Sequence, residues 1–361
     1  MSNRCYNFGA GPCTLPLEVL EEAQQEFVEF QNKGMSILEM SHRGETYEAV
    51  HNEAVQLAKE LYQTPNDFEV LFIQGGATLQ FSMIPMNFLK ENQKAAYIIC
   101  GTWSEKAYED AIIYGKAYKA WDGKPNSFIK MPFNQEIKIE ENTSYLHITS
   151  NETIGGLRMI EWPEVKVPMI ADMSSDFFTR LIPWEKFDLV YGGVQKNLGP
   201  AGMAVVFIRK SKLENLNKNI GKYLRYDIHD KNNSLYNTPP VFPIYMTGKV
   251  LKHIKKTGGI QGVADRAQAR ANMIYQMVDQ SNGYYRCPIE TKYRSLMNIV
   301  FRLPTESLEK KFLSEATKAG FIGLEGHRSV GGCRASCYNA LPLEWVEALT
   351  LFMKNFQKQN A

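Results

Sequence analysis

Residues 188–203 read DLVYGGVQKNLGPAGM and place one lysine, Lys196, among small residues just after an apolar run. The run 189–191 is typical of a short buried strand, and the two glycines after it let the backbone turn closely. Glycine and proline at 199–202 prevent a helix from forming before the next apolar run, AVVFIRK. We therefore predict that Lys196 is held on a tight bend between two strands of a sheet.

A lysine fixed at the end of a buried strand must lose the water around its ammonium group. Desolvation lowers the pKa of the amine and makes it a usable nucleophile. The alternative is an ordinary loop lysine in water, and the neighbouring residues decide between the two interpretations. Upstream, VPMIADMSSDFF (167–178) reads as a strand that ends in Asp172 and is followed by small hydroxyl residues. The spacing of Asp172 and Lys196 suits the ends of two neighbouring strands.

A second candidate site lies at 69–89, where the pattern changes from strand (EVLFIQ) through a glycine turn (GGATLQ) to helix (FSMIPMNFL). The glycines permit close backbone approach, and the amides of Ala77 and Thr78 at the helix start, with the Thr78 hydroxyl, can bind a phosphate group. No GK[ST] follows and there is no GxGxxG, so the pattern indicates neither a nucleoside triphosphate nor a dinucleotide site.

Strand-like and amphipathic helical runs alternate along most of the chain. This order predicts an α/β fold with a mostly parallel sheet covered on both faces and with ligand chemistry at the carboxyl ends of the strands. The polar segment 223–243 is predicted to be an irregular connection. Helices are predicted at 16–30, from about Thr46, from about Tyr245, at 263–279, at about 307–319 and at 343–356.

The composition is that of an ordinary globular protein: of 361 residues, 44% are hydrophobic and 22% are charged, and the formal net charge is +2. This charge favours neither nucleic acid nor an anionic membrane as a partner. No run approaches the roughly 18 apolar residues of a membrane span, and the start of the chain lacks the pattern of an export signal. The six cysteines have no CxxC spacing, so we expect a reducing cytoplasm and no metal site.

Several motifs in order resemble one known family. They are ADMSSDFFTR (171–180), YGGVQKNLGPAG (191–202), SHRGETYEAVHNEA (41–54) and GHRSVGGCRASCYNALP (326–342). Together they resemble the phosphoserine aminotransferase family of class V pyridoxal-phosphate-dependent aminotransferases, and the match runs from FGAGPCTLP at Phe8 to the C-terminus.

This resemblance implies an aspartate aminotransferase-like (fold type I) architecture. A large domain, 16–260, would carry pyridoxal 5′-phosphate on its mostly parallel sheet, and a smaller α+β C-terminal domain would comprise 261–361 with 1–15. The resemblance also implies a homodimer with composite active sites, because NTPP (237–240) is similar to the family's loop that reaches the cofactor phosphate of the other subunit.

The resemblance implies a role for each residue around the cofactor. Lys196 would hold the cofactor as a Schiff base and move a proton, Asp172 would pair with the pyridinium nitrogen, and Trp103 would stack on the ring. Some relatives have arginine at the position of Thr78. Because this chain has threonine there, it lacks one possible contact to the substrate phosphate. The implied cofactor-binding residues are Ala77, Thr78, Trp103, Thr153, Asp172, Gln195, Lys196, Asn237 and Thr238.

The substrates implied are small amino acids and 2-oxo acids: O-phospho-L-serine with 3-phosphohydroxypyruvate, and L-glutamate with 2-oxoglutarate, in serine biosynthesis. The related 4-phosphohydroxythreonine reaction of pyridoxine biosynthesis is left open. Arg334 would bind the α-carboxylate, and His42, Arg43, His327 and Arg328 the distal anion. Taken alone, each His-Arg pair is also typical of a solvated loop or surface turn, and Trp103 of simple packing.

Two other functions were weighed against this one. A cysteine desulfurase of the same fold needs a cysteine on a mobile loop, whereas Cys333 and Cys337 are predicted to lie beside a core strand. A cofactor-binding regulator without enzymatic activity needs a DNA-binding module, and no basic helix-turn-helix pattern precedes the first predicted helix.

Overall fold

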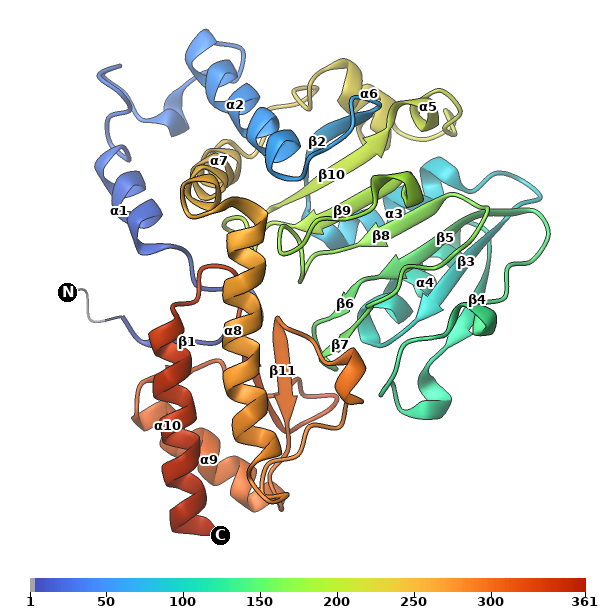
Figure 1. Ribbon diagram of the computed structural model, residues 1–361. Helices are drawn as coiled ribbons and strands as arrows, with labels where there is room; N and C mark the ends of the chain where they lie inside the picture. The colour runs from blue at the N-terminus through green and yellow to red at the C-terminus, as the bar shows by residue number, and fades with distance from the viewer. Residues whose placement is uncertain (1–3) are drawn as a thin grey trace.

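The computed structural model describes residues 4–361. Its centre is a seven-stranded sheet with the strand order β2-β10-β9-β8-β5-β3-β4 (Figure 1). Strands β9, β8, β5, β3 and β4 run parallel, and β10 is antiparallel to both β9 and β2. The mostly parallel sheet is therefore confirmed. The strands are β2 (Phe68–Gln74), β3 (Lys94–Ile99), β4 (Lys116–Asp122), β5 (Thr143–Thr149), β8 (Met169–Asp172), β9 (Leu189–Gly193) and β10 (Met203–Arg209).

Helices cover both faces of this sheet, with α2 (Glu45–Leu61) and α7 (Val241–Lys256) in front of it in Figure 1, and α3 (Gly76–Phe88) and α4 (Thr102–Tyr114) behind it. Side chains alternate between the two faces along each strand. In β9, for example, Val190 belongs to the hydrophobic cluster under α2 and α7, while Leu189 and Tyr191 belong to the cluster under α3 and α4. Burial on both faces explains why these strands read as continuous apolar runs.

The C-terminal part of the chain forms a second layer around the long helix α8 (Gly259–Asp279). Strands β11 (Asn298–Phe301) and β13 (Cys333–Ser336) pair antiparallel, and β1 (Tyr6–Asn7) pairs parallel with β12 (Phe321–Ile322). The remaining elements are α1 (Leu17–Gln25), α5 (Lys210–Leu213), α6 (Tyr226–Lys231), α9 (Glu306–Lys318), α10 (Leu343–Asn360), β6 (Asn151–Glu152), β7 (Leu157–Arg158) and the 3-10 helices η1 (Ile37–Glu39), η2 (Lys124–Asn126), η3 (Asn134–Glu136), η4 (Trp184–Lys186), η5 (Lys222–Leu224) and η6 (Thr291–Tyr293).

Two local predictions were wrong. The helix predicted at 16–30 ends at Gln25, and Phe30 is buried instead by edge-on contact with Tyr245 across a bend, with ring centroids 5.9 Å apart. The segment 223–243, predicted to be irregular, contains α6, whose Tyr226 is fully buried, and the first residues of α7. In both places tertiary packing decides the structure, and the local pattern does not report it.

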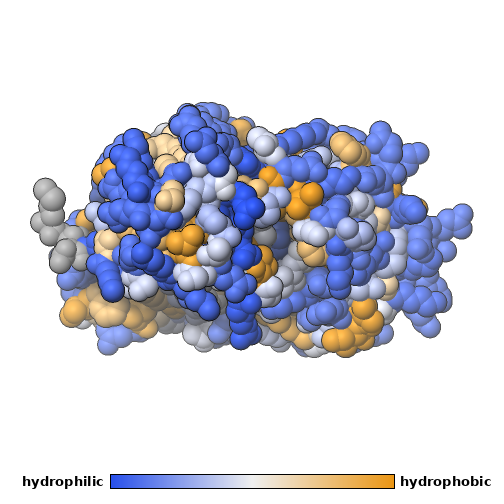
Figure 2. Space-filling model, turned by 90° about the horizontal axis from the view of Figure 1, so that it is seen from below, coloured by the Kyte–Doolittle hydropathy of each residue, from blue (hydrophilic) through white to orange (hydrophobic). Residues whose placement is uncertain are grey.

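Hydrophilic side chains predominate on the face in Figure 2, and hydrophobic residues form small scattered patches among them. Within residues 4–361, none of the helices is both long and apolar enough to cross a membrane. The same part of the chain has no cluster of three or more histidine, cysteine, aspartate or glutamate side chains that could hold a metal ion.

Gly192 in β9 allows the turn after Asp172 to pack directly on the strand. A Cβ atom at this position would lie 2.5 Å from Cδ1 of the buried Phe177 ring. We expect Gly192→Ala to lower the free energy of unfolding by roughly 1–3 kcal/mol, because the ring has no free volume into which to move. Gly221→Ala is the matched control, since a Cβ atom there has no neighbour within 4 Å. Urea unfolding of both variants checks this, and equal stabilities would contradict it.

Candidate active site

Asp172 and Lys196 lie at the carboxyl edge of the sheet, where the sequence placed them. Asp172 is the last residue of β8, Lys196 follows β9 by three residues, and the two strands are parallel neighbours. A pocket opens between these strand ends and the starts of α3 and α4. It is lined by Ala77, Thr78, Phe81, Trp103, Thr149, Asn151, Thr153, Asp172, Ser174, Ser175, Gln195 and Lys196.

Lys196 is almost wholly buried, with 8% of its surface exposed. Its Nζ atom donates a hydrogen bond to Thr153 Oγ1 at 2.7 Å and lies 5.7 Å from the centroid of the Trp103 ring. Burial lowers the pKa of the lysine, although the nearby carboxylates of Asp172 and Glu152 oppose that change. The result is a buried amine that loses its proton more easily than a lysine in water.

Asp172 is buried and held from one side. The backbone N–H of Ser174 and its hydroxyl donate hydrogen bonds to Oδ1 at 2.9 and 2.6 Å. Burial raises the pKa of the Asp172 carboxyl, while Lys196 and the Ser174 bonds act against that rise. Within residues 4–361 no hydrogen bond reaches Oδ2, so this oxygen is free for a cationic or N–H partner in the pocket.

The start of α3 forms the opposite wall. Gly75 caps the helix with φ +106°, a conformation that glycine adopts without strain, and its N–H bonds to the carbonyl of Gly202 at 3.0 Å. The first turn of α3 then presents Ala77 and Thr78 to the pocket. Backbone N–H groups at a helix start, aided by the helix dipole, are suited to an anionic group such as a phosphate.

Several buried polar atoms around the pocket have no hydrogen-bond partner among residues 4–361. They are Trp103 Nε1, Thr149 Oγ1, Gln195 Oε1 and Arg334 Nε. Buried polar atoms are normally paired, so this group indicates a polar ligand with several hydrogen-bonding positions. Pyridoxal phosphate has an aldehyde, a ring nitrogen, a ring hydroxyl and a phosphate, and the lysine, the acid, the hydroxyls and the helix start fit these groups.

Arg334 reaches the same site from β13. It is 8% exposed, and its Nη1 atom donates to the carbonyl of Thr153 at 3.2 Å. His327 and Arg328 lie on the preceding loop, where Nδ1 of His327 is 2.7 Å from the Ser329 hydroxyl. Partial burial and the positive charges of Arg334, Arg328 and Lys106 lower the pKa of His327. Arg334, Arg328 and Lys106 therefore lie close enough to His327 to disfavour its protonated form.

Seven of the residues singled out in the sequence do not line this pocket: Arg334, which contacts it through Thr153, its neighbours His327 and Arg328, and His42, Arg43, Asn237 and Thr238. The His42 ring is half-buried just before α2, and Arg43 is exposed beside it. The Asn237 amide lies 3.4 Å from both Gln74 Oε1 and the Tyr223 hydroxyl, and Thr238 is exposed. Within a single chain the last four of these side chains thus stand apart from Lys196.

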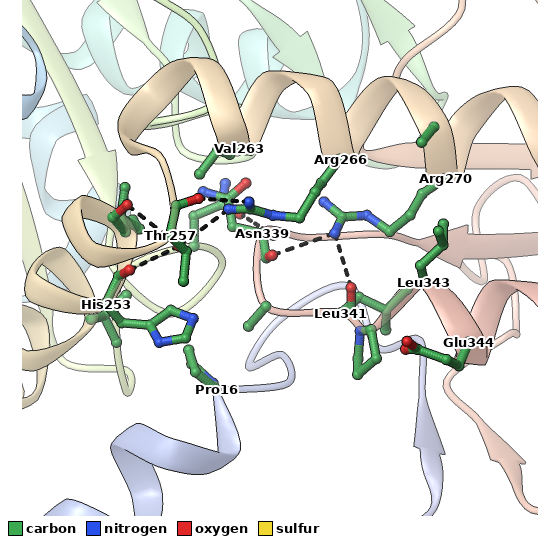
Figure 3. A pocket seen from close by; sticks show the side chains of 16 residues that line it. Pro16, His253, Thr257, Val263, Arg266, Arg270, Asn339, Leu341, Leu343 and Glu344 are labelled. Atoms are coloured by element: carbon green, nitrogen blue, oxygen red, sulfur yellow. Dashed lines mark hydrogen bonds between the residues drawn. The ribbon is translucent and has the colours of Figure 1, made fainter.

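The sequence did not single out Arg270, which Figure 3 shows beside Asn339 and Leu341. It extends from α8 beside a cavity of about 350 Å³, and its Nη1 atom donates to the carbonyls of Leu341 and Asn339 at 2.9 and 3.4 Å. The N–H of Asn339 in turn bonds to Oδ1 of Asn197, the residue after Lys196, at 3.1 Å. The sequence held one signal for this residue: Arg270 is a charged residue three positions after Ala267, on the apolar side of the predicted helix.

The sequence also did not point to Glu152, although it is the residue before Thr153. It is 1% exposed and accepts hydrogen bonds from backbone N–H groups on both sides of the site. Burial raises the pKa of its carboxyl to about 7. A lone acid beside a strand end carries no distinctive spacing, so only the structure shows this arrangement.

Residues 5–349 match the family model described as Aminotransferase class-V. The chain is 53% identical over 361 residues to the phosphoserine aminotransferase of Lysinibacillus sphaericus (strain C3-41), covering 100% of both chains. The solved phosphoserine aminotransferase of Bacillus circulans subsp. alkalophilus is 51% identical, with a TM-score of 0.98 over 100% of both chains. A pyridoxal-phosphate-bound phosphoserine aminotransferase from Trichomonas vaginalis is 38% identical, with a TM-score of 0.93 over 97% of this chain and 100% of that one.

These similarities extend over the whole fold, including the strand ends that carry Asp172 and Lys196, and they confirm the predicted fold type I architecture. Identity of about half the residues over the full length indicates membership of the same family as well as a shared fold. The chain belongs to the class V aminotransferases, and within them to the phosphoserine aminotransferase family.

Proposed function

We propose that the protein is a pyridoxal-phosphate-dependent transaminase of serine biosynthesis. It exchanges the amino group reversibly between O-phospho-L-serine with 3-phosphohydroxypyruvate and L-glutamate with 2-oxoglutarate. The observation that carries this proposal is the buried lysine whose Nζ atom is held by Thr153, beside the buried Asp172 and within reach of Arg334. The 4-phosphohydroxythreonine reaction of pyridoxine biosynthesis is chemically parallel, and the same residues would serve it.

The cofactor, when bound, supplies an aldehyde for the amino group and a ring that accepts electrons from the substrate. Lys196 would hold the aldehyde carbon, and Oδ2 of Asp172 would keep the ring nitrogen protonated. Trp103 would contact one face of the ring, and Thr153 the ring hydroxyl. The phosphate would be bound by the start of α3 with Ala77 and Thr78, by Gln195, and by Asn237 and Thr238 of the partner subunit.

Lys196 would also move the proton at the substrate Cα. Burial lowers the pKa of this amine, which favours the neutral form that can accept the proton and return it later. Arg334 would orient both substrates, since its planar fork binds a carboxylate through two parallel hydrogen bonds. Because Arg334 is itself anchored to the Thr153 carbonyl, the carboxylate and the lysine would be held in one fixed relation.

The distal end of the substrate needs cations that accept either a phosphate or a γ-carboxylate. His327 and Arg328 are the candidates within the chain, and an anion there would reverse the positive field that now lowers the pKa of His327. His42 and Arg43 would be supplied by the partner subunit. Their position outside the pocket of their own chain supports a homodimer with composite active sites.

The division into two domains, 16–260 and 261–361 with the N-terminal residues, belongs to the same proposal; residues 1–3 lie outside the described part. In its support, one hydrophobic cluster consists of Phe8 and residues between 271 and 356. Ile260 and Val263, at the start of α8, belong instead to the cluster under the sheet, so α8 would connect the two domains.

We also propose a cytoplasmic location, since all six cysteines are unpaired.

A cysteine desulfurase activity is not supported. Cys333 and Cys337 are buried in and just after β13, and burial raises the pKa of the Cys337 thiol to about 12. Cys13, the thiol nearest the lysine, donates to the carbonyl of Lys196, and burial raises its pKa to about 12 as well. Thiols in this state are poor nucleophiles.

Lys196→Ala is expected to abolish transamination, because the variant lacks both the group that holds the cofactor and the group that moves the proton. Borohydride reduction of the wild-type protein followed by peptide mapping should place the cofactor on Lys196. Lys210→Ala, on an exposed face, is the control and should keep full activity. Cofactor attached to another lysine would refute the assignment.

Asp172→Asn should retain the cofactor far better than it retains activity. The amide keeps the size of the side chain but removes the charged hydrogen bond to the ring, which raises the barrier by on the order of several kcal/mol. Absorbance measures cofactor content and steady-state kinetics measure kcat. A variant that turns over nearly as fast as the wild type would show that Asp172 has another role.

Arg43→Ala and Arg328→Ala should lose more activity on O-phosphoserine than on alanine, because alanine has no distal anion. Arg334→Lys should instead lose activity on both amino acids, since both carry the α-carboxylate. Comparison of kcat/KM for the two substrates in each variant checks this. Equal losses on phosphoserine and alanine in both arginine-to-alanine variants would place the phosphate pocket elsewhere.

A further inference from the structure

Glu152 lies directly behind the wall of the candidate active site, in the short strand β6. Its two carboxylate oxygens accept hydrogen bonds from two different segments of backbone. Oε2 accepts the N–H of Trp103 at 3.1 Å, and Oε1 accepts the N–H of Ile154 at 3.2 Å. One buried side chain therefore joins the first turn of α4 to the turn that carries Thr153.

The position of this carboxylate is tightly determined. Helix α4 begins after Gly101, which has no side chain to cap the free N–H groups, so the acid of β6 supplies an acceptor and a negative charge at the positive end of the helix. A Cβ atom on Gly101 would lie 2.5 Å from Cγ of Glu152. The glycine thus makes room for the acid, and the acid replaces the missing cap.

The charged and titratable groups that affect Glu152 or are affected by it are Lys196, Asp172, Arg334 and Cys100. No salt bridge to Glu152 forms within residues 4–361. Burial raises the pKa of its carboxyl to about 7, while the two N–H bonds and Lys196 favour the ionised form. A buried acid that is held by two backbone N–H groups but has no salt-bridge partner is costly to keep, which indicates a role beyond filling space.

We propose that Glu152 is a positioning residue for transamination, which fixes the Trp103 ring and the Thr153–Lys196 contact in one frame and supplies negative charge beside the lysine. This inference rests on the proposed function, because Trp103 and Lys196 matter only if the cofactor binds between them. Both backbone groups are donors, so the side chain must offer two acceptors. A carboxylate does so, whereas an amide offers one acceptor and turns its NH₂ group toward the other N–H.

Two substitutions separate position from charge. Glu152→Gln keeps the size and removes the charge and one acceptor; Glu152→Asp keeps the charge but shortens the reach. Glu105→Gln is the matched control, an acid in the first turn of the same helix that is outside the pocket. The measurements are the pH titration of the visible absorption band of the bound cofactor, its visible circular dichroism, and kcat and KM for both substrates.

For Glu152→Gln we expect the titration midpoint of the absorption band to fall by roughly one pH unit, because a nearby negative charge favours the protonated form. We expect kcat to fall on the order of 10-fold to 100-fold with a smaller change in KM, because the reacting groups are misplaced after the substrate has bound. Glu152→Asp should restore much of the midpoint but not kcat. Glu105→Gln should match the wild type in every measurement.

A wild-type midpoint and kcat in Glu152→Gln would overturn the proposal. So would a lower melting temperature with unchanged midpoint, circular dichroism and kcat, since that result describes a merely structural residue. If Glu152→Gln does not fold, Glu152→Asp decides alone: reduced kcat at a near wild-type midpoint supports the proposal, and wild-type kcat refutes it. Failure of the wild-type protein to bind the cofactor or to transaminate phosphoserine would instead contradict the proposed function.

Discussion

The burial of one ammonium group is the constraint on which the rest of the site depends. Lys196 has almost no contact with water, so its charged form must be stabilised by the protein or lost. Two opposing effects act on the ammonium group. Burial lowers the pKa of the lysine and so disfavours the charged form, whereas the carboxylates of Asp172 and Glu152 stabilise it. The same desolvation raises the pKa of Asp172. Burial therefore disfavours the charged form of both groups, and each opposes that effect on the other through its charge.

The direction of the strands makes this arrangement possible. Asp172 and Lys196 come together because β8 and β9 are parallel neighbours, which brings their carboxyl ends to one edge. The chain then reverses within a few residues into β10, which is why β10 is antiparallel in an otherwise mostly parallel region. A crossover helix at this point would carry the backbone away from the pocket. The tight return instead keeps Gln195 and Lys196 at the sheet edge, where both line the pocket.

The sequence predicted Lys196, Asp172 and the glycine turn before α3 as parts of the site because each follows an apolar run that indicates a buried strand. It could not find Glu152, whose two partners, Trp103 and Ile154, lie in different segments. The bend after Gln25 was missed for a similar reason, since Phe30 keeps helical spacing in the sequence but is buried by contact with Tyr245. Local patterns report which side chains are buried. They do not report which distant segment buries them. The capping of α4 by Glu152 of β6 joins two such distant segments, so the sequence pattern does not show it.

The two ends of a substrate would meet different kinds of protein surface. Arg334 is buried, fixed to the Thr153 carbonyl and joined through it to the lysine, so the carboxylate common to every substrate would meet a rigid partner. Arg328 is exposed, and the His327 ring is hydrogen-bonded to its loop neighbour Ser329. An enzyme that exchanges the amino group between phosphoserine and glutamate binds a phosphate in one half-reaction and a smaller carboxylate in the other, which a rigid distal site could not do equally well. The cationic side chain of Arg328 on its loop would adapt to both anions, while the rigid end would keep Cα at the same distance from Lys196 in each half-reaction.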